Sequence, residues 1–260
     1  MRLSRTLLAT AASALLACAS LAATTGSAEA APSWAPADKA VIHPGTMMYT
    51  DGAQCTANFV YTDSVPLGTK VTFTNDGNLA SEGTAVGHGT LAYSSWITEH
   101  NLGTSDASTC AYNDLALVKV DAADVSKVNP SVPFWGGPTG IDTDGTKAGD
   151  RVWTFGNSSL RAGLTPLSPH TGISLGDDAA DGGWTHPLYT VTPGVPGDSG
   201  SAFISADGKA IGTLSTLGLA PLPLSNNIGD LGKELAFAQA HSGIAGLQLV
   251  NGTEPFDPVL

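Results

Sequence analysis

The stretch Pro193–Ala202, PGVPGDSGSA, places a serine between Gly-Asp and Gly, directly before an apolar run. A tight turn of this kind displays a serine hydroxyl as a nucleophile. Gly197 lets the backbone turn, so that the amides of Gly197 and Ser199 can point at one developing oxyanion. The stretch therefore predicts a nucleophile at Ser199, with Gly197 and Ser199 as oxyanion donors. An ordinary Asp-Ser-Gly turn in a β loop is the alternative.

A second stretch, Tyr112–Val120, reads YNDLALVKV and places an acid directly before an apolar strand. A buried carboxylate in that position can hold an imidazole in one tautomer, and a serine needs such a base to take its proton. The stretch predicts that Asp114 is the acid that orients the base. The alternative is an aspartate that only caps the entrance to a strand.

Short β-like runs recur along the chain between Gly, Pro, Asn and Asp turns, which predicts an all-β protein of barrels or sandwiches. The expected strands are residues 58–62, 70–75, 91–98, 115–120, 151–155, 189–192, 202–205 and 210–217. One helix is expected late in the chain, within NNIGDLGKELAFAQAHSG. Ile228, Leu231, Leu235 and Ala238 would share its apolar face, with Asn226 or Asn227 as the cap and Gly243 at the end.

The first thirty residues read as a secretory signal peptide. Arg2 and Arg5 precede an apolar run, and Ala28-Glu29-Ala30 forms a small-x-small cleavage site. The predicted organisation is a signal peptide at 1–30, a truncated N-terminal β-barrel at 31–128, a Gly/Pro-rich link at 129–149 and a C-terminal β-barrel with the helix at 150–260. Acylation of Cys18, which would anchor the chain to a lipid surface, is the alternative.

The composition limits the classes of partner that the chain is expected to bind. A formal net charge of −12 argues against nucleic acid, whose phosphates need Lys and Arg, and fits a secreted, extracellular monomer. No apolar run after the signal is long enough to span a membrane. No zinc motif is present, and the aspartates of Asp142–Gly145 and Asp177-Asp178 lack full calcium-ligand spacing, so no metal or cofactor is expected.

Together these motifs resemble the secreted bacterial members of the trypsin/chymotrypsin-like serine proteases. DLALVKV (114–120) is similar to the aspartate strand of that family and PGDSGSA (196–202) to its serine turn. CTANFV (55–60) resembles the strand before the histidine, and IGTLSTLGL (211–219) the strand beside the specificity pocket. The resemblance implies two perpendicular six-stranded antiparallel barrels, with a peptide-hydrolysing site between them. Pro193 at the pocket base and Leu217 at its wall imply a preference for small or apolar side chains.

The histidine that the resemblance requires is absent from its place. In the Ser-His-Asp catalytic triad of this family, the histidine stands roughly 45 residues before the aspartate. Counting back from Asp114 by that spacing reaches the neighbourhood of Thr69, in SVPLGTK. The Ala-Ala-His-Cys block of the family occurs nowhere in the sequence, so the first barrel is expected to be incomplete. The histidines before Asp114 are His43, His88 and His100, and His88 is the first to consider as a base. The remaining three, His170, His186 and His241, are expected at the surface or at helix ends.

The cysteines fit the loss of a segment. By resemblance Cys55 would pair with the cysteine after the missing histidine, and Cys110 has no obvious partner. Two alternatives therefore stand for the cysteines: both are free, or they form a new Cys55–Cys110 disulfide. Two also stand for the lost segment: a natural deletion, or an error in the gene. Two functions follow. One is a serine endopeptidase-like protein with impaired catalysis, and the other is an inactive homologue that binds peptides or proteins.

Overall fold

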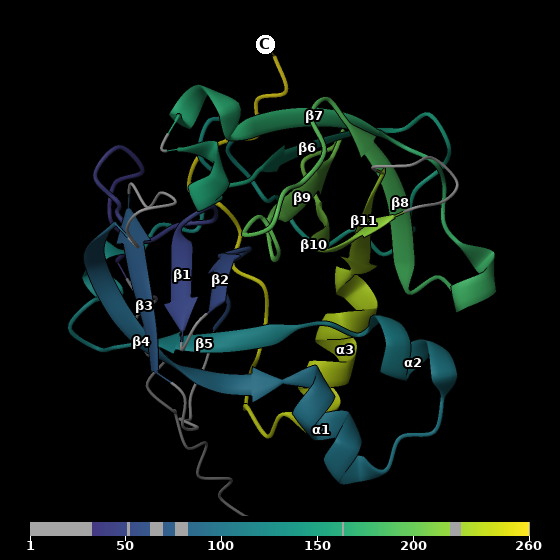
Figure 1. Ribbon diagram of the computed structural model, residues 1–260. Helices are drawn as coiled ribbons and strands as arrows, with labels where there is room; N and C mark the ends of the chain where they lie inside the picture. Colours follow the sequence, from purple (N-terminus) through teal and green to yellow (C-terminus); the bar gives the residue numbers. More distant parts are fainter. Residues whose placement is uncertain are drawn as a thin grey trace, which may run out of the picture. The chain divides into compact units, whose positions relative to one another are not determined.

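The strands form two antiparallel sheets, and the first is open (Figure 1). The computed structural model describes residues 33–50, 53–62, 70–75, 83–162, 164–218 and 225–259. The expected signal peptide lies outside these residues, and the domain boundaries stay predictions. The first sheet has the order β2-β1-β3-β4-β5. Its strands are β1 (Met47–Thr50), β2 (Ala53–Thr56), β3 (Lys70–Asn75), β4 (Thr84–Ser94) and β5 (Ala116–Val120).

Among the described residues, the first half therefore does not form the closed six-stranded barrel that the resemblance implies. It forms an open five-stranded sheet, in agreement with the expectation that the first barrel is incomplete. No strand among the described residues joins β2 to β5. Other parts of the chain cover the end of β2 instead. The Thr56 N–H donates to the Ser199 carbonyl at 2.8 Å, and Tyr61 forms an isolated antiparallel bridge with Leu249.

The second sheet is the expected closed six-stranded barrel. It closes in the order β10-β11-β8-β7-β6-β9, with every pair antiparallel. The strands are β6 (Arg151–Phe155), β7 (Pro169–Ser174), β8 (Thr185–Thr190), β9 (Ala202–Ser205), β10 (Ala210–Gly218) and β11 (Ser225–Asp230). The Ser199 turn lies between β8 and β9, and Asp114 lies just before β5, so the site depends on how the two sheets meet.

The late helix forms as α3 (Leu231–His241), but it begins later than expected. Residues 225–230 are strand β11, so neither Asn226 nor Asn227 caps the helix. Asp230 does so, because its side chain accepts the Lys233 N–H at 2.7 Å. Two further helices, α1 (Ser95–Leu102) and α2 (Ala107–Tyr112), were not expected. The run at 91–98 therefore leaves the sheet at Ser94 instead of continuing as a strand.

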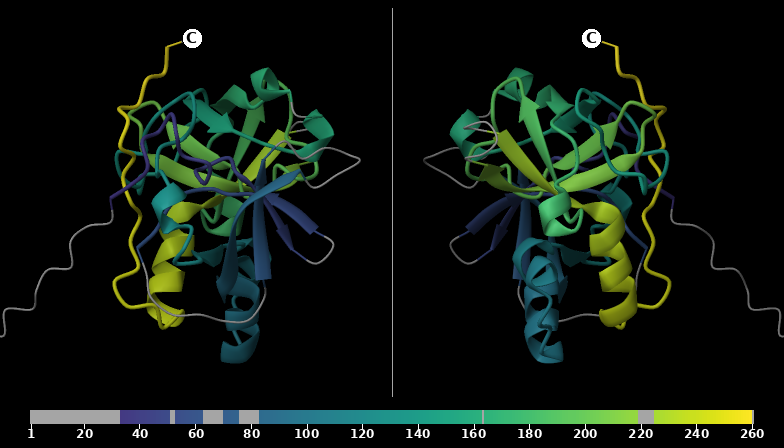
Figure 2. Two further views of the ribbon diagram at one scale, coloured as in Figure 1. Left: turned by 90° about the vertical axis from the view of Figure 1, so that its left-hand side faces the viewer. Right: turned by 90° about the vertical axis from the view of Figure 1, so that its right-hand side faces the viewer.

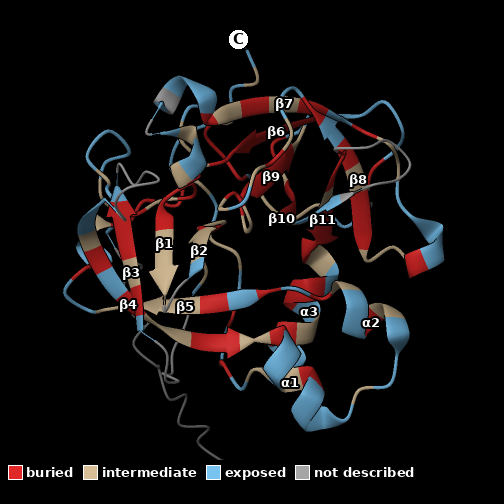
Figure 3. Cartoon of the chain, in the orientation of Figure 1, coloured by how far each residue is buried: buried red, intermediate tan, exposed pale blue. Residues whose placement is uncertain are grey.

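The largest apolar core joins both sheets to α3 and to the C-terminal segment (Figure 3). It contains Tyr93 and Leu117 from the first sheet, Trp153 and Ile204 from the barrel, and Leu235 from α3. A separate cluster of six fully buried or nearly buried side chains fills the barrel interior: Val152, Leu188, Phe203, Ile211, Leu214 and Ile228. Because one core serves both sheets, packing fixes β5, which follows Asp114, and β9, which follows the Ser199 turn, against each other.

Candidate active site

The Ser199 turn has the backbone that the sequence predicts. Gly197 has a φ of +100° and Gly200 a φ of +90°, a region that L side chains rarely adopt. A Cβ on Gly197 would also come within 2.8 Å of the Ser158 hydroxyl, and one on Gly200 within 2.4 Å of the Thr56 carbonyl oxygen. Both glycines are therefore required by conformation and by space.

The two predicted oxyanion donors are available to a ligand. Within the part of the chain that the structure describes, neither the Gly197 N–H nor the Ser199 N–H donates a hydrogen bond. The turn is closed by neighbouring groups instead. The Asp198 N–H donates to the Val195 carbonyl, and the Ser201 N–H donates to the Asp198 carbonyl, each at 2.9 Å. Free amides on a fixed turn can stabilise a developing negative charge.

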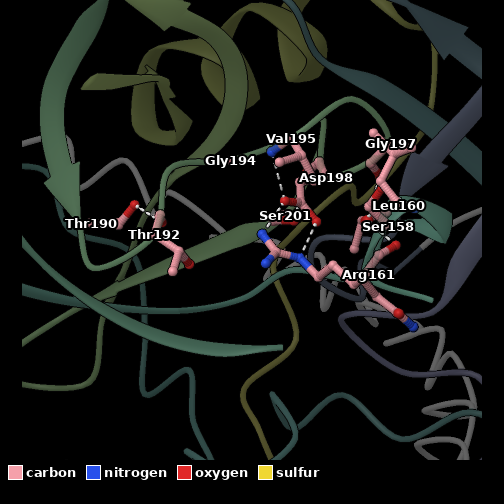
Figure 4. Close-up of polar contacts among 12 residues, drawn as sticks. Ser158, Leu160, Arg161, Thr190, Thr192, Gly194, Val195, Gly197, Asp198 and Ser201 are labelled. Carbon is pink, nitrogen blue, oxygen red and sulfur yellow. Dashed lines mark hydrogen bonds and ion pairs between the residues drawn. The ribbon is translucent and has the colours of Figure 1, made fainter. Parts of the chain in front are cut away.

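An ion pair inside the barrel anchors this turn (Figure 4). Arg161, at the end of a short 3₁₀ helix (Ser159–Arg161), donates through Nε to Oδ1 of Asp198 at 3.2 Å and through a terminal nitrogen to Oδ2. The Val195 N–H also donates to Asp198 Oδ2 at 2.9 Å. Asp198 and Arg161 retain only 2% and 9% of their side-chain exposure, so the residue before Ser199 is held by a buried, charge-assisted contact.

Asp114 lies at the edge of the first sheet with its side chain open to solvent. The Ser215 hydroxyl donates to Asp114 Oδ2 at 2.7 Å. Protein atoms on the other sides of the carboxyl remove water from it, and this desolvation raises the pKa of Asp114, while the hydrogen bond from Ser215 opposes the rise. In a Ser-His-Asp catalytic triad the aspartate is buried beneath the imidazole, so the exposure of Asp114 differs from that arrangement.

The structure brings Asp114 and Ser199 to one place through β10 and β2. Leu214, the neighbour of Ser215, accepts the Gly200 N–H at 2.6 Å. On the other side, the half-buried Cys55 lies close enough to Asp114 that, after burial, the charge of Asp114 raises the pKa of its thiol. Thr56, next to Cys55, binds the Ser199 carbonyl. Both candidate residues therefore face the same junction between the sheets.

No histidine completes this arrangement. All six histidines of the chain lie within the described residues, and none of them forms a hydrogen bond or ion pair with Asp114 or Ser199. His88 is exposed on β4, opposite Thr72 and beside Asp121. At about 3.3 Å per residue of strand, it lies roughly 20 Å from Asp114. His88 is thus too distant to serve as the base.

The other histidines have different surroundings. His43 contacts the Pro44 carbonyl at 2.8 Å, and His100 lies in the last turn of α1. His241 ends α3, as expected. The expectation that His170 and His186 are surface or helix-end residues is wrong, because both lie on strands of the closed barrel and are buried. They are 7% and 1% exposed.

Each buried histidine has a structural setting of its own. His186 bridges Asp177 and Asp230 at 2.7 and 2.9 Å. Burial by itself would lower the pKa of His186, but the two carboxylates outweigh it and raise the pKa. His170 has an unpartnered Nε2 among the described residues. Burial, followed by the charge of Arg161, lowers the pKa of His170 to about 4.

A small cavity adjoins the serine turn inside the barrel. Arg161, His170 and Asp198 line it together with Thr192, Gly194 and Asn226. Thr192 has a φ of +66°, unusual for a β-branched residue, and Gly194 donates its N–H to Asn226 Oδ1 at 2.8 Å. Pro193 and Leu217, the residues expected at a specificity pocket, do not line this cavity, and Leu217 is exposed.

Sequence reasoning missed three residues of the site: Ser215, Arg161 and Glu234. Glu234 has no exposed surface, and its Oε1 accepts the Asp114 N–H at 3.1 Å. A signal for it was present, since Glu234 is the acidic residue on the face of the helix that carries Leu231, Leu235 and Ala238. Ser215 and Arg161 had no such signal, because each meets its partner only through the folding of distant segments.

Both remaining cysteines are free. Cys55 is half-buried and Cys110 is exposed, with its thiol donating to the Thr104 carbonyl at 3.4 Å. In the described ranges, no group of three or more His, Cys, Asp or Glu side chains is placed to hold a metal ion. None of the helices there is long and apolar enough to cross a bilayer.

Comparison with known proteins yields distant likenesses. No protein-family profile matches the chain, and no curated protein is similar to it. Thermobifida fusca protease A shares 18% identity at a TM-score of 0.48, over 82% of this chain and 100% of its own. Nocardiopsis protease shares 18% sequence identity at a TM-score of 0.46, over 80% of this chain and 98% of its own. Cellulomonas bogoriensis chymotrypsin shares 17% sequence identity at a TM-score of 0.46, over 81% of this chain and 98% of its own. These likenesses are too remote to carry an argument about activity.

Proposed function

We propose that this protein is a secreted serine-endopeptidase homologue that binds peptides beside Ser199 and hydrolyses them slowly. The observation that carries the proposal is the junction itself. The Ser199 turn and the Asp114–Ser215 pair meet there, while all six histidines lie elsewhere. Without a base, the Ser199 hydroxyl keeps its proton and is a weak nucleophile.

The remaining parts still have a catalytic use. The free N–H groups of Gly197 and Ser199 can donate hydrogen bonds to the oxyanion of a tetrahedral intermediate, and a bound peptide would lie against them. In serine-protease variants that lack a triad residue, these features leave roughly 10³- to 10⁴-fold catalysis over water. We therefore expect slow turnover with intact peptide binding, and a preference for small or apolar side chains.

A fully active endopeptidase is the second candidate. It uses the same serine turn as the first candidate, and the buried Arg161–Asp198 pair holds that turn in both cases. This candidate requires a base that is not a histidine of this chain, since none contacts Ser199.

Fluorophosphonate labelling read by intact mass separates the candidates. Labelling of the wild-type protein at the rate of an active serine hydrolase, absent in Ser199→Ala, would establish the active enzyme. We expect labelling to be slow or undetectable while fluorescence polarisation shows that the protein binds short peptides.

The binding measurement has a matched pair of variants. Gly197→Ala strains a φ of +100° and places a Cβ against Gln54 and Ser158, so we expect it to weaken peptide binding. Gly140→Ala, where a Cβ meets nothing within 4 Å, should bind as the wild type does. Equal binding by the two variants, or no binding by the wild-type protein, would refute the proposed peptide site beside Ser199.

A further inference from the structure

His186, on β8, has both ring nitrogens bonded to carboxylates. Nδ1 lies 2.7 Å from Asp177 Oδ1, and Nε2 lies 2.9 Å from Asp230 Oδ2. The ring is buried, with 1% of its side-chain surface exposed. Strand β8 pairs with β11, which ends in Asp230 and runs directly into α3 (Figure 1). His186 therefore joins the loop after β7, which carries Asp177, to the start of α3.

Each of the two carboxylates also accepts hydrogen bonds from other groups. Oδ1 of Asp177 accepts the N–H and the hydroxyl of Thr146, at 2.7 and 3.0 Å. Oδ1 of Asp230 accepts the Lys233 N–H at 2.7 Å and so caps α3. Such bonds favour the ionised carboxyl, which has no proton to donate. Both nitrogens of His186 are therefore donors, and the ring is an imidazolium.

The charges around the ring agree with this protonation state. Against the effect of burial, Asp230 and then Asp177 raise the pKa of His186. The other charged groups on the elements packed against the ring have contacts of their own or are exposed. They are Asp181, bonded to the Gly183 and Trp184 N–H groups; Lys233, 5.9 Å over the Trp184 ring; Glu234, bonded to the Asp114 N–H; and the exposed Asp178 and Lys147.

The two carboxylates differ in their access to water. The side chain of Asp177 is 39% exposed, against 12% for Asp230. A neutral imidazole donates from one nitrogen only, so loss of the proton would turn a lone pair toward one of the carboxylates. The carboxylate that water solvates more readily is the one that leaves, and this is Asp177. Asp230 keeps its bond to the ring and its place as the cap of α3.

We propose that His186 is a pH-sensitive latch between the barrel and the segment before β6 (residues 142–150). As an imidazolium, it holds Asp177 against Thr146 and so ties the loop after β7 to this segment. When the ring loses its proton, Asp177 turns to solvent and the Thr146 N–H loses its acceptor. The latch is closed below the pKa of His186 and open above it, whether or not a peptide binds beside Ser199.

The Thr146 N–H is the point at which opening can be observed. In the part of the chain that the structure describes, Asp177 is its one acceptor. The Thr146 hydroxyl has a second partner, because Ser174 donates to it at 2.7 Å. Opening of the latch therefore exposes the Thr146 amide while this hydroxyl contact keeps the residue in place.

The test is amide hydrogen exchange of the full chain, followed by NMR from about pH 5 to about pH 9, on both sides of the usual histidine pKa. Protection factors correct for the faster intrinsic exchange at high pH. We expect the protection factor of the Thr146 N–H to fall roughly tenfold or more as His186 titrates, because it loses a charged acceptor. The Lys233 N–H, bonded to Asp230, is the internal reference and should keep its protection.

The protonation of His186 is measured separately. Long-range nitrogen–proton NMR spectra show whether each imidazole nitrogen carries a proton, and the signals lost in His186→Gln identify the ring. We expect both nitrogens to be protonated at about pH 6, and the titration midpoint to lie above the ordinary value of 6.5. Observing the ring itself separates its titration from that of Glu234, whose pKa also responds to the charge of Asp230.

Variants locate the latch. His186→Gln can donate to one carboxylate at most, as the neutral ring does, so the Thr146 N–H should be weakly protected at every pH. Asp177→Asn keeps an oxygen for Thr146 but has no charge, so it should lower the pKa of His186. Asp178→Asn, at the exposed neighbouring position, is the matched control and should titrate as the wild type does. Thermal melting shows whether each variant is folded, and Asp177→Asn keeps the test valid if His186→Gln is not.

Several results would overturn the proposal. One is a ring nitrogen of His186 without a proton at about pH 6. Another is protection of the Thr146 N–H that stays constant while the ring titrates. Loss of protection at Lys233 in place of Thr146 would put the release at Asp230, and an unchanged pKa of His186 in Asp177→Asn would show that the two side chains are not coupled.

Discussion

Glu234 is a carboxylic acid with no exposed surface, placed in the first turn of α3. Its Oε1 accepts the Asp114 N–H, and Thr213 donates to Oε2 at 3.5 Å. A Cβ on Gly229 would lie 2.2 Å from the same carboxyl, so the glycine makes room for it. Burial, together with the charges of Asp114 and Asp230, raises the pKa of Glu234 to about 8, against its bonds to the Asp114 N–H and Thr213.

This residue predicts a pH dependence of stability. A carboxyl whose folded-state pKa is raised holds its proton in the folded protein after the unfolded chain has lost it. The free energy of unfolding should therefore fall as pH rises from about 4.5 to 8, at no more than about 1.4 kcal/mol per pH unit. Denaturant unfolding across this range should show a flatter profile for Glu234→Gln than for the wild type. Glu254→Gln, at an exposed position, should keep the wild-type slope, and an unchanged slope in Glu234→Gln would contradict the prediction.

At the scale of elements, the anchor of the Ser199 turn joins the 3₁₀ helix at Ser159–Arg161 to the loop before β9. Neither side chain of the Arg161–Asp198 pair can be solvated where it stands. Removing one partner of a buried ion pair leaves the other uncompensated, and this costs about 3–5 kcal/mol.

We therefore expect Arg161→Met to destabilise the protein by about that amount. Because Asp198 precedes Ser199, the same change should also slow any labelling of Ser199. Arg151→Met is the matched control, since Arg151 is exposed and lies 5.1 Å over the Trp153 ring. Loss of this contact in Arg151→Met should lower the free energy of unfolding by less than about 1 kcal/mol. Denaturant unfolding measures the loss of unfolding free energy in each variant. Equal losses in Arg161→Met and Arg151→Met would mean that the buried pair does not stabilise the fold.

At the scale of the whole described chain, the segment after α3 holds both sheets (Figure 2). Thr62 donates its N–H to the Gln248 carbonyl and Val250 donates to Val60, so the segment runs beside the end of the first sheet. Farther on, Gly137, in the segment before the barrel, donates its N–H to the Glu254 carbonyl, and the Phe256 ring packs edge-on against Trp153 of β6. This segment covers part of the first sheet that no strand of the described chain pairs.

A chain that ends at Gly243 should therefore lose its cooperative thermal transition. The truncation removes the buried Ile244 and Leu247, whose burial stabilises the fold by about 1.5–3 kcal/mol each, and the backbone hydrogen bonds to residues 60–62 and 135–138. A chain that ends at Asp257 keeps those contacts and should melt close to the full-length protein. Differential scanning calorimetry of the two truncations tests this, and cooperative melting of the shorter chain at the same temperature would refute it.

Local patterns predicted much of this protein. Short β-like runs between turn residues indicated β3, β6 and β9 with their observed bounds, and the serine turn followed from the glycines that flank Asp198-Ser199. These features depend on a few consecutive residues, so the sequence alone was sufficient. By resemblance alone, it also predicted that no histidine stands where the serine-protease family carries its base.

Tertiary structure decided the rest. Residues 225–230 carry a helix-like pattern, yet they pair with β8 and β10 as a strand, because without them the facing edges of β8 and β10 would be unpaired. The open first sheet, the contact of Ser215 with Asp114 and the burial of His170, His186 and Glu234 arise between residues far apart in the chain. Such contacts depend on which segments pack together, and no local pattern of side chains encodes that.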